Sequence, residues 1–93
     1  MHDNSVFAEY RSFEGVNEAW ELQRTGMIVV HNKMYRLELW HCHSNVEVPY
    51  YVSVYVSIDN VWRRLPDPPF TVALDGDEAL RRAMMFVSER FAA

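Results

Sequence analysis

Two histidines flank the single cysteine of the chain in the segment His41-Cys42-His43, and both residue types serve as metal ligands and in nucleophilic catalysis. Side chains two positions apart on a strand point to the same side, so both imidazoles could reach one ion while the thiol points away. Zinc needs three or four protein ligands, and the candidates for a third are Glu47, His31 and His2. The alternative is that both histidines end a strand and pack at the margin of a sheet. We expect no resident metal or other cofactor, and keep a metal site at His41, His43 and Glu47 as the alternative.

Cys42 could instead act as a nucleophile, because a thiolate beside a histidine base is a recurrent catalytic pair. The base must lie within hydrogen-bond reach of the thiol, however, and strand neighbours such as His41 and His43 face the opposite way. No cysteine-protease signature surrounds the residue. We therefore favour a small, mostly buried apolar role for Cys42. A single cysteine also permits no internal disulfide, which indicates a reducing, cytoplasmic setting.

The size and charge of the chain limit the classes of function. Its 93 residues predict one domain, residues 1–93, and its 49% apolar and 14% aromatic residues are typical of a folded protein. Part of this apolar surface could serve a subunit interface instead of a core. The formal charge of −4 disfavours broad phosphate binding. The N-terminal residues lack signal-peptide features, and no apolar stretch approaches the about 20 residues of a membrane helix, so we expect no membrane contact.

The strongest structural pattern lies in residues 48–58. Mainly valines occupy the even positions, whereas Tyr51, Tyr55 and small serines occupy the odd ones. Such alternation with β-branched side chains predicts a half-buried strand. We call the side of the even positions the valine face. We expect Val52 and Val54, which lie on it, in the main core, and the tyrosines on the opposite face.

Two turn signals predict two antiparallel hairpins. Asn32-Lys33 would join residues 27–31 to residues 34–42, with Ile28 opposite Leu37. Asp59-Asn60 would join the strand at 48–58 to a short returning strand at 61–65. In the first hairpin, the side chains expected on the valine face are Ile28, Val30, Tyr35, Leu37 and Leu39, and those on the other face are Val29, Arg36, Glu38 and Trp40.

Two helices are predicted to flank this sheet. Ser12 can cap a helix over residues 13–25, because apolar residues recur there at spacings of three and four and Gly26 follows where a terminal glycine belongs. Asp75 and Glu78 form a capping box for a C-terminal helix. We therefore expect an α+β fold, in which an antiparallel sheet of three to five strands has an N-terminal and a C-terminal helix packed on one face. Further extended segments are expected at residues 5–10 and 70–74.

Aromatic residues opposite the valine face form the candidate binding surface. Tyr51 and Tyr55 project from that face, and clusters of exposed aromatic side chains mark partner surfaces in many proteins. The candidate ligand or interface residues are Tyr51, Tyr55, Trp40, Trp62 and Arg64. The alternative is a second core, in which the N-terminal segment with Phe7, or Phe70 and the proline-rich loop, folds over them.

Two arginine pairs, Arg63-Arg64 and Arg81-Arg82, could form an anion site, because arginine suits phosphate and carboxylate groups. Acidic residues are abundant in the first half of the chain, so we favour internal or intersubunit ion pairs instead. The sequence carries no glycine-rich phosphate loop, nucleophile-elbow motif or paired-carboxylate motif, which favours a protein that is not an enzyme.

The order of helix, three strands and helix over residues 12–92 resembles a double-stranded-RNA-binding domain. The resemblance implies lysines at the start of the last helix that hold phosphates. Here that start carries Asp75, Asp77 and Glu78, which would repel phosphate, so nucleic acid is disfavoured as a partner. In its short, motif-free α+β build, the chain is also similar to the orphan proteins of bacterial integron gene cassettes, a likeness that implies frequent dimers.

These patterns favour a cytoplasmic, non-enzymatic interaction module that self-associates, with a homodimer as the preferred form. Its working surface would be the face of Tyr51 and Tyr55, and another protein or a small molecule is a further candidate partner. The alternative is a small-ligand or metal-binding protein, conceivably an enzyme, that uses His41, His43 and Glu47. RNA binding ranks third.

Overall fold

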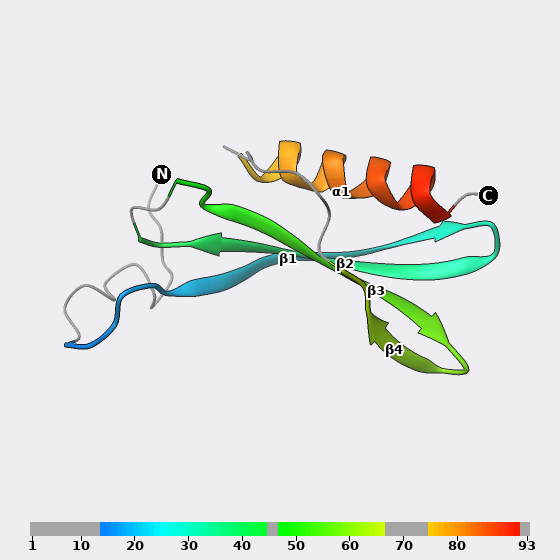
Figure 1. Ribbon diagram of the computed structural model, residues 1–93, viewed down its shortest axis with the longest axis horizontal. Helices are drawn as coiled ribbons and strands as arrows, with labels where there is room; N and C mark the ends of the chain where they lie inside the picture. The colour runs from blue at the N-terminus through cyan, green and yellow to red at the C-terminus, as the bar shows by residue number, and fades with distance from the viewer. Residues whose placement is uncertain (1–13, 45–46, 67–74, 92–93) are drawn as a thin grey trace.

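The structure is a computed structural model that describes residues 14–44, 47–66 and 75–91. They form two layers, an antiparallel sheet and a helix that lies along one of its faces (Figure 1). The four strands are ordered as in the sequence and are all antiparallel. Together with the helix, this sheet confirms an α+β architecture. The elements are β1 (Trp20–Val30), β2 (Lys33–Cys42), β3 (Tyr50–Ile58), β4 (Val61–Arg64) and α1 (Gly76–Phe91).

The prediction of a helix over residues 13–25 is wrong. Residues 14–19 form no helix, and β1 begins directly after them. β1 pairs with β2, and the pairing shifts between Leu22 and Arg24, so that Gln23 forms a bulge. A bulge reverses the alternation of side chains along a strand, so it hides the period of two in residues 20–30, whereas the spacings that predicted a helix lie before it in the sequence. The described residues therefore contain one helix, α1, instead of the two that were expected on the sheet.

Both hairpins turn on two residues with a left-handed backbone. The φ angles are 50° and 66° at His31 and Asn32, and 51° and 65° at Asp59 and Asn60. Positive φ at both central residues defines the turns whose twist matches the flanking strands, and asparagine and aspartate tolerate this conformation. The second turn is where the sequence predicted it.

The first turn lies one residue earlier than predicted, which changes the register of its hairpin. Ile28 lies opposite Tyr35 instead of Leu37. Each partner moves by two positions, and side chains alternate with a period of two, so the faces remain as predicted. The valine face carries Ile28, Val30, Tyr35, Leu37, Leu39, Tyr50, Val52, Val54 and Val56.

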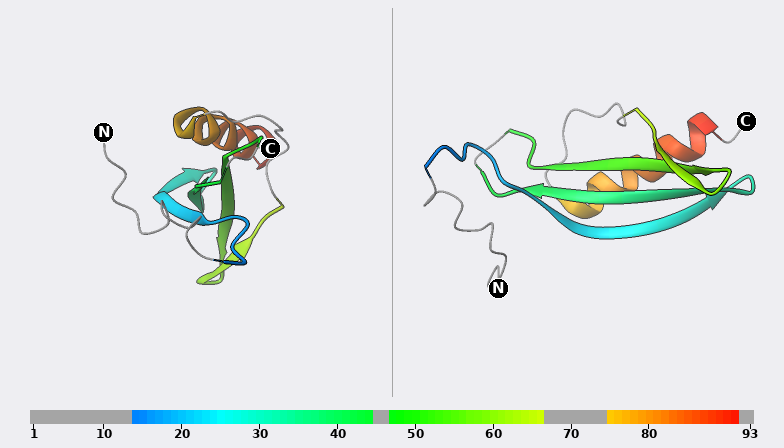
Figure 2. Two further views of the ribbon diagram at one scale, coloured as in Figure 1. Left: turned by 90° about the vertical axis from the view of Figure 1, so that its left-hand side faces the viewer. Right: turned by 90° about the horizontal axis from the view of Figure 1, so that it is seen from below.

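The core lies between the valine face and α1. Val52 and Val54 have exposed fractions of 0%, as predicted, and so do Ala79, Ala83 and Val87 of the helix. Burying one valine side chain contributes about 1.5–3 kcal/mol to the stability of the fold. α1 contacts β1, β2 and β3, so the helix ties the central strands to one margin of the sheet (Figure 2).

The start of α1 is capped as the sequence predicted. The backbone N–H of Glu78 donates a hydrogen bond of 2.8 Å to Oδ1 of Asp75. Asp77 and Glu78 place negative charge in the first turn, where the helix dipole favours it. Met84 of α1 is 41% exposed and does not belong to the buried core.

The predicted extended segments at residues 5–10 and 70–74 lie outside the described residues, as do Phe7 and Phe70. Within the described ranges, no helix has both the length and the apolar character needed to cross a lipid bilayer.

Candidate functional site: an aromatic sheet face

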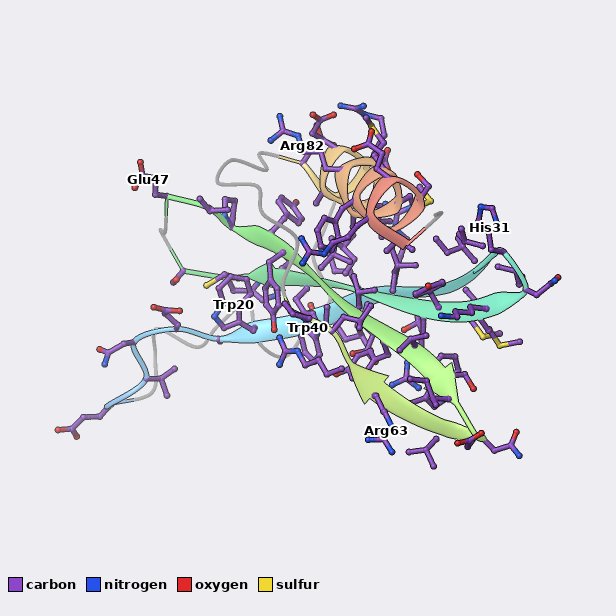
Figure 3. All side chains as sticks on the ribbon, turned by 45° about the vertical axis from the view of Figure 1, so that its right-hand side comes forward. Trp20, His31, Trp40, Glu47, Arg63 and Arg82 are labelled. Carbon is purple, nitrogen blue, oxygen red and sulfur yellow. The ribbon has the colours of Figure 1, made fainter. Side chains whose placement is uncertain are left out.

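The sheet face opposite α1 carries five aromatic side chains from all four strands. We call it the aromatic face and define it by Trp20, Trp40, Tyr51, Tyr55 and Trp62. The strand registers place them together, and Figure 3 shows Trp20 and Trp40 on the side of the sheet away from the helix that carries Arg82. All five are partly exposed. The predicted residues Trp40, Tyr51, Tyr55 and Trp62 thus share one face.

Three of these rings contact one another at one end of the face. The rings of Trp40 and Tyr51 are nearly parallel, with centroids 6.4 Å apart and planes at 12°. Trp20 meets Tyr51 edge to face, with centroids 5.3 Å apart and planes at 80°. The indole N–H of Trp40 also donates a hydrogen bond of 2.8 Å to Ser53, a buried side chain that is 2% exposed. These contacts fix the ring positions before any partner binds.

The other two rings hold a cation. The guanidinium carbon of Arg36 lies 4.6 Å from the ring centre of Tyr55 and 4.9 Å from that of Trp62. Its Nε lies 3.7 Å from a carboxylate oxygen of Glu38. A cation over an aromatic ring contributes about 0.5–1 kcal/mol at exposed sites and more when water is removed. This end of the face is therefore ordered and carries charges of both signs.

Exposed apolar side chains continue the aromatic face towards the β1 margin. The exposed fractions are 61% for Met27 and 65% for Val29, and 42% for both Leu22 and Met34. Single exposed apolar residues are ordinary, but several on one face beside ordered aromatic rings form a candidate contact surface. Arg64 lies opposite Tyr55 in the β3–β4 register and is exposed, so it belongs to this face as predicted.

The two histidines of the alternative site lie close together. The ring centres of His41 and His43 are 4.8 Å apart, and His41 also stacks on Tyr50 at 4.6 Å. Nε2 of His43 lies 2.9 Å from a carboxylate oxygen of Glu21, and the His43 side chain is only 5% exposed. Glu47 is exposed and points outward in Figure 3. No group of three or more His, Cys, Asp or Glu side chains among the described residues could hold a metal ion.

Cys42 is a free, buried thiol, 2% exposed, on the opposite side of the strand from His41. Its Sγ lies 2.8 Å from Oγ of Ser44. The position agrees with the small, buried side chain that we favoured, and among the described residues the side chain that contacts the thiol is a serine and not a histidine.

Arg81 and Arg82 form ion pairs within α1, as we favoured. Their guanidinium groups lie 2.9 Å and 2.8 Å from one carboxylate oxygen of Glu78. Hydrogen bonds from Arg81, and to a lesser extent from Arg82, lower the pKa of the Glu78 carboxyl group. The hydrogen bond to the same carboxylate raises the pKa of Arg81.

The sequence analysis did not find Trp20, Arg36 or Glu21 as site residues. Trp20 and Glu21 were assigned to a helix because of the apolar spacings that precede them, and the bulge at Gln23 interrupts the alternation that would have indicated a strand. Arg36 was placed on the correct face, but nothing in the sequence shows that its side chain lies between two rings.

No protein-family model, curated protein or solved structure matches this chain. No relative therefore supplies a function for the aromatic face.

Proposed function

We propose that the protein is a non-enzymatic interaction module that self-associates, and that the aromatic face is its contact surface with a second copy. The observation that carries this proposal is a set of five ordered aromatic rings on a sheet face that no described helix covers. The free thiol of Cys42 agrees with a reducing compartment such as the cytoplasm.

The chemistry of the aromatic face suits a protein partner. Tryptophan, tyrosine, methionine and arginine are the residue types enriched at the energetic centres of protein interfaces. Tyrosine and tryptophan combine a large apolar area with a polar group that tolerates water. Because stacking already holds Trp40 and Tyr51, binding would cost less side-chain entropy than it costs for free rings.

A second copy of the chain is the partner that best fits this face. The face carries both Arg36 and Glu38, with side chains 29% and 15% exposed, so a two-fold contact can place opposite charges together. Two sheets packed face to face form a layer about 10 Å thick filled by such side chains. A small domain gains buried apolar surface in this way that its single core cannot provide.

The other two candidate functions have less support. A metal site at His41 and His43 lacks a third ligand among the described residues, and His43 already bonds Glu21. RNA binding loses its structural basis because residues 20–30 form a strand where the resemblance required a helix.

The test is a Tyr51→Ser/Tyr55→Ser double variant, measured by size-exclusion chromatography with light scattering. We expect its mass to fall by half relative to the wild type at equal concentration, while its circular dichroism spectrum is retained. Met85→Ser is the control, because Met85 is 46% exposed on α1, on the other side of the sheet. A double variant with the mass of the wild type would refute the proposal, and so would a wild type that is monomeric at high micromolar concentration.

A further inference from the structure

The two edges of the sheet differ in how well they are protected. β4 has only four residues and ends with Arg63 and Arg64, and short, charged edge strands resist pairing with other chains. β1 has eleven residues and is the other edge of the sheet formed by the described residues, as the right-hand view of Figure 2 shows. Its segment from Thr25 to Val30 contains neither a charge nor a proline. Such a segment is able to pair with another strand.

The backbone geometry identifies which groups of β1 point outward. In a two-residue hairpin, the residues next to the turn exchange both hydrogen bonds, and bonded pairs then alternate with non-bonded ones. Val30 pairs with Lys33 next to the turn, so Val30, Ile28 and Gly26 bond to β2. The N–H and C=O groups of the residues between them, Thr25, Met27 and Val29, are therefore directed away from β2.

An apolar groove lies beside this edge, between β1 and α1. Its volume is about 280 Å³, and its lining includes Gly26, Ile28, Leu80 and Met84. A Cβ atom added at Gly26 would meet no atom within 4 Å, so the missing side chain leaves the groove open next to the edge. A strand added to β1 would direct alternate side chains into this groove.

We propose that β1 pairs with β1 of a second copy, antiparallel and about a two-fold axis at Met27. This inference rests on the proposed self-association and adds a second contact to it. The register places Met27 opposite the partner's Met27, and Thr25 opposite the partner's Val29, so the outward backbone groups meet. It also places the partner's Ile28 opposite Gly26, where its side chain enters the open groove.

A second copy fits this edge better than an unrelated peptide, because the match is reciprocal. Ile28 of each copy lies at Gly26 of the other copy, so the same surface serves on both sides, as an isologous contact requires. Arg24, the one charged residue between positions 24 and 30, lies opposite the partner's Val30, so no like charges meet. The pairing joins two four-stranded sheets into one, with both helices on one side and both aromatic faces on the other. Contact between the aromatic faces of two such dimers then gives a tetramer.

The test compares Met27→Pro with its matched control Met27→Thr by light scattering. Proline removes the outward N–H and is tolerated at an edge position that does not bond to the sheet, whereas threonine keeps the N–H and suits a strand. Both variants lose the Met27 side chain, so a difference between them reports on the outward N–H; we expect Met27→Thr to form the larger assembly and Met27→Pro to form a dimer through the aromatic face. The Tyr51→Ser/Tyr55→Ser variant should form a dimer through the edge, and the triple variant a monomer.

The outcomes separate the two proposals. If Met27→Pro and Met27→Thr have the same mass, the edge contact is refuted and the aromatic contact is unaffected. If Met27→Pro is a monomer and the tyrosine variant keeps the mass of the wild type, the edge contact stands and the aromatic contact is refuted. A monomeric wild type refutes both.

Hydrogen exchange of the wild type gives a second test that needs no variant. At high concentration, the amides of Thr25, Met27 and Val29 should become protected, and dilution to the monomer should expose them. The amides of Gly26, Ile28 and Val30 should stay protected at both concentrations because they bond to β2. Free exchange at Met27 in the concentrated protein would overturn the edge pairing even if Met27→Pro fails to fold.

Discussion

The indole Nε1 of Trp40 donates a hydrogen bond of 2.8 Å to Oγ of Ser53, and this bond links β2 and β3 across the aromatic face. In the sheet, Trp40 lies opposite Tyr51, so Ser53 is its diagonal neighbour, within reach of a long side chain. The bond holds the indole ring in place beside Tyr51, which it stacks on. A serine in the middle of a strand thus positions an aromatic ring that belongs to the proposed contact surface.

Replacing Ser53 with alanine should destabilise the protein. The change leaves the partly buried indole N–H without its acceptor, which costs about 1–3 kcal/mol. Ser57→Ala is the control, because Ser57 lies on the same strand and face, whereas the hydrogen bond of Trp40 goes to Ser53. Urea denaturation of both variants measures the difference, and equal stabilities would show that the Trp40 bond contributes nothing.

Val54→Asp should unfold the protein or destabilise it severely. Val54 is 0% exposed under α1, and a buried charge without a partner costs several kcal/mol. Val61→Asp makes the same chemical change at a position that is 52% exposed and should have a small effect. Thermal denaturation followed by circular dichroism compares them, and a Val54→Asp variant that melts within a few degrees of the wild type would contradict the assigned core.

The histidine pair should not retain zinc. Two imidazoles do not complete a zinc site, which needs three or four protein ligands. We expect protein purified without a histidine tag, and dialysed against zinc-free buffer, to contain far less than one zinc ion per chain. Stoichiometric zinc that is lost in a His41→Ala/His43→Ala variant would refute this expectation, and a Glu47→Ala variant would then show whether Glu47 is the third ligand.

The stability that Glu78 contributes should depend on pH. Hydrogen bonds from Arg81 and Arg82 lower its pKa below the ordinary value of 4.5, so the unfolded chain takes up a proton at a higher pH than the folded chain. The contribution is therefore present above pH 4.5 and is lost as the pH falls through the lower, folded-state pKa.

The matching experiment compares the wild type with Glu78→Gln by denaturation from pH 7 down to pH 3. The wild type should be the more stable protein at pH 7, and the difference should shrink below pH 4.5. Glu89→Gln is the control on the same helix, because no ion pair of Glu89 is seen in the described residues. A Glu78→Gln difference that stays constant over this range would show that the pairing with both arginines does not stabilise the helix.

The sequence predicted well wherever a regular alternation met a clear turn. The faces of β3 follow directly from its valines and tyrosines, and the cap at Asp75 follows from the capping-box spacing. The position of Tyr51 and Tyr55 opposite the core was therefore predictable. Their stacking partners were less so, because contacts such as Arg36 between Tyr55 and Trp62 depend on side-chain conformations.

The first element was wrong because its signal is not regular. The bulge at Gln23 shifts the phase of β1, and Gly26 in the middle of the strand imitates the end of a helix. The first turn was missed by one residue because Asn32 was taken as the first central residue, whereas asparagine is the second central residue in both hairpins. Neither error is visible in the sequence alone, since pairing with β2 is what selects a strand over a helix for residues 20–30.

All three tryptophans of the chain belong to the aromatic face, and none lies between the sheet and α1. The intrinsic fluorescence of the protein therefore reports on that face and not on the packing of the core. Binding at the face should shift the emission to shorter wavelengths without any change in the helix signal. Conversely, loosening of α1 from the sheet should leave the emission maximum almost unchanged.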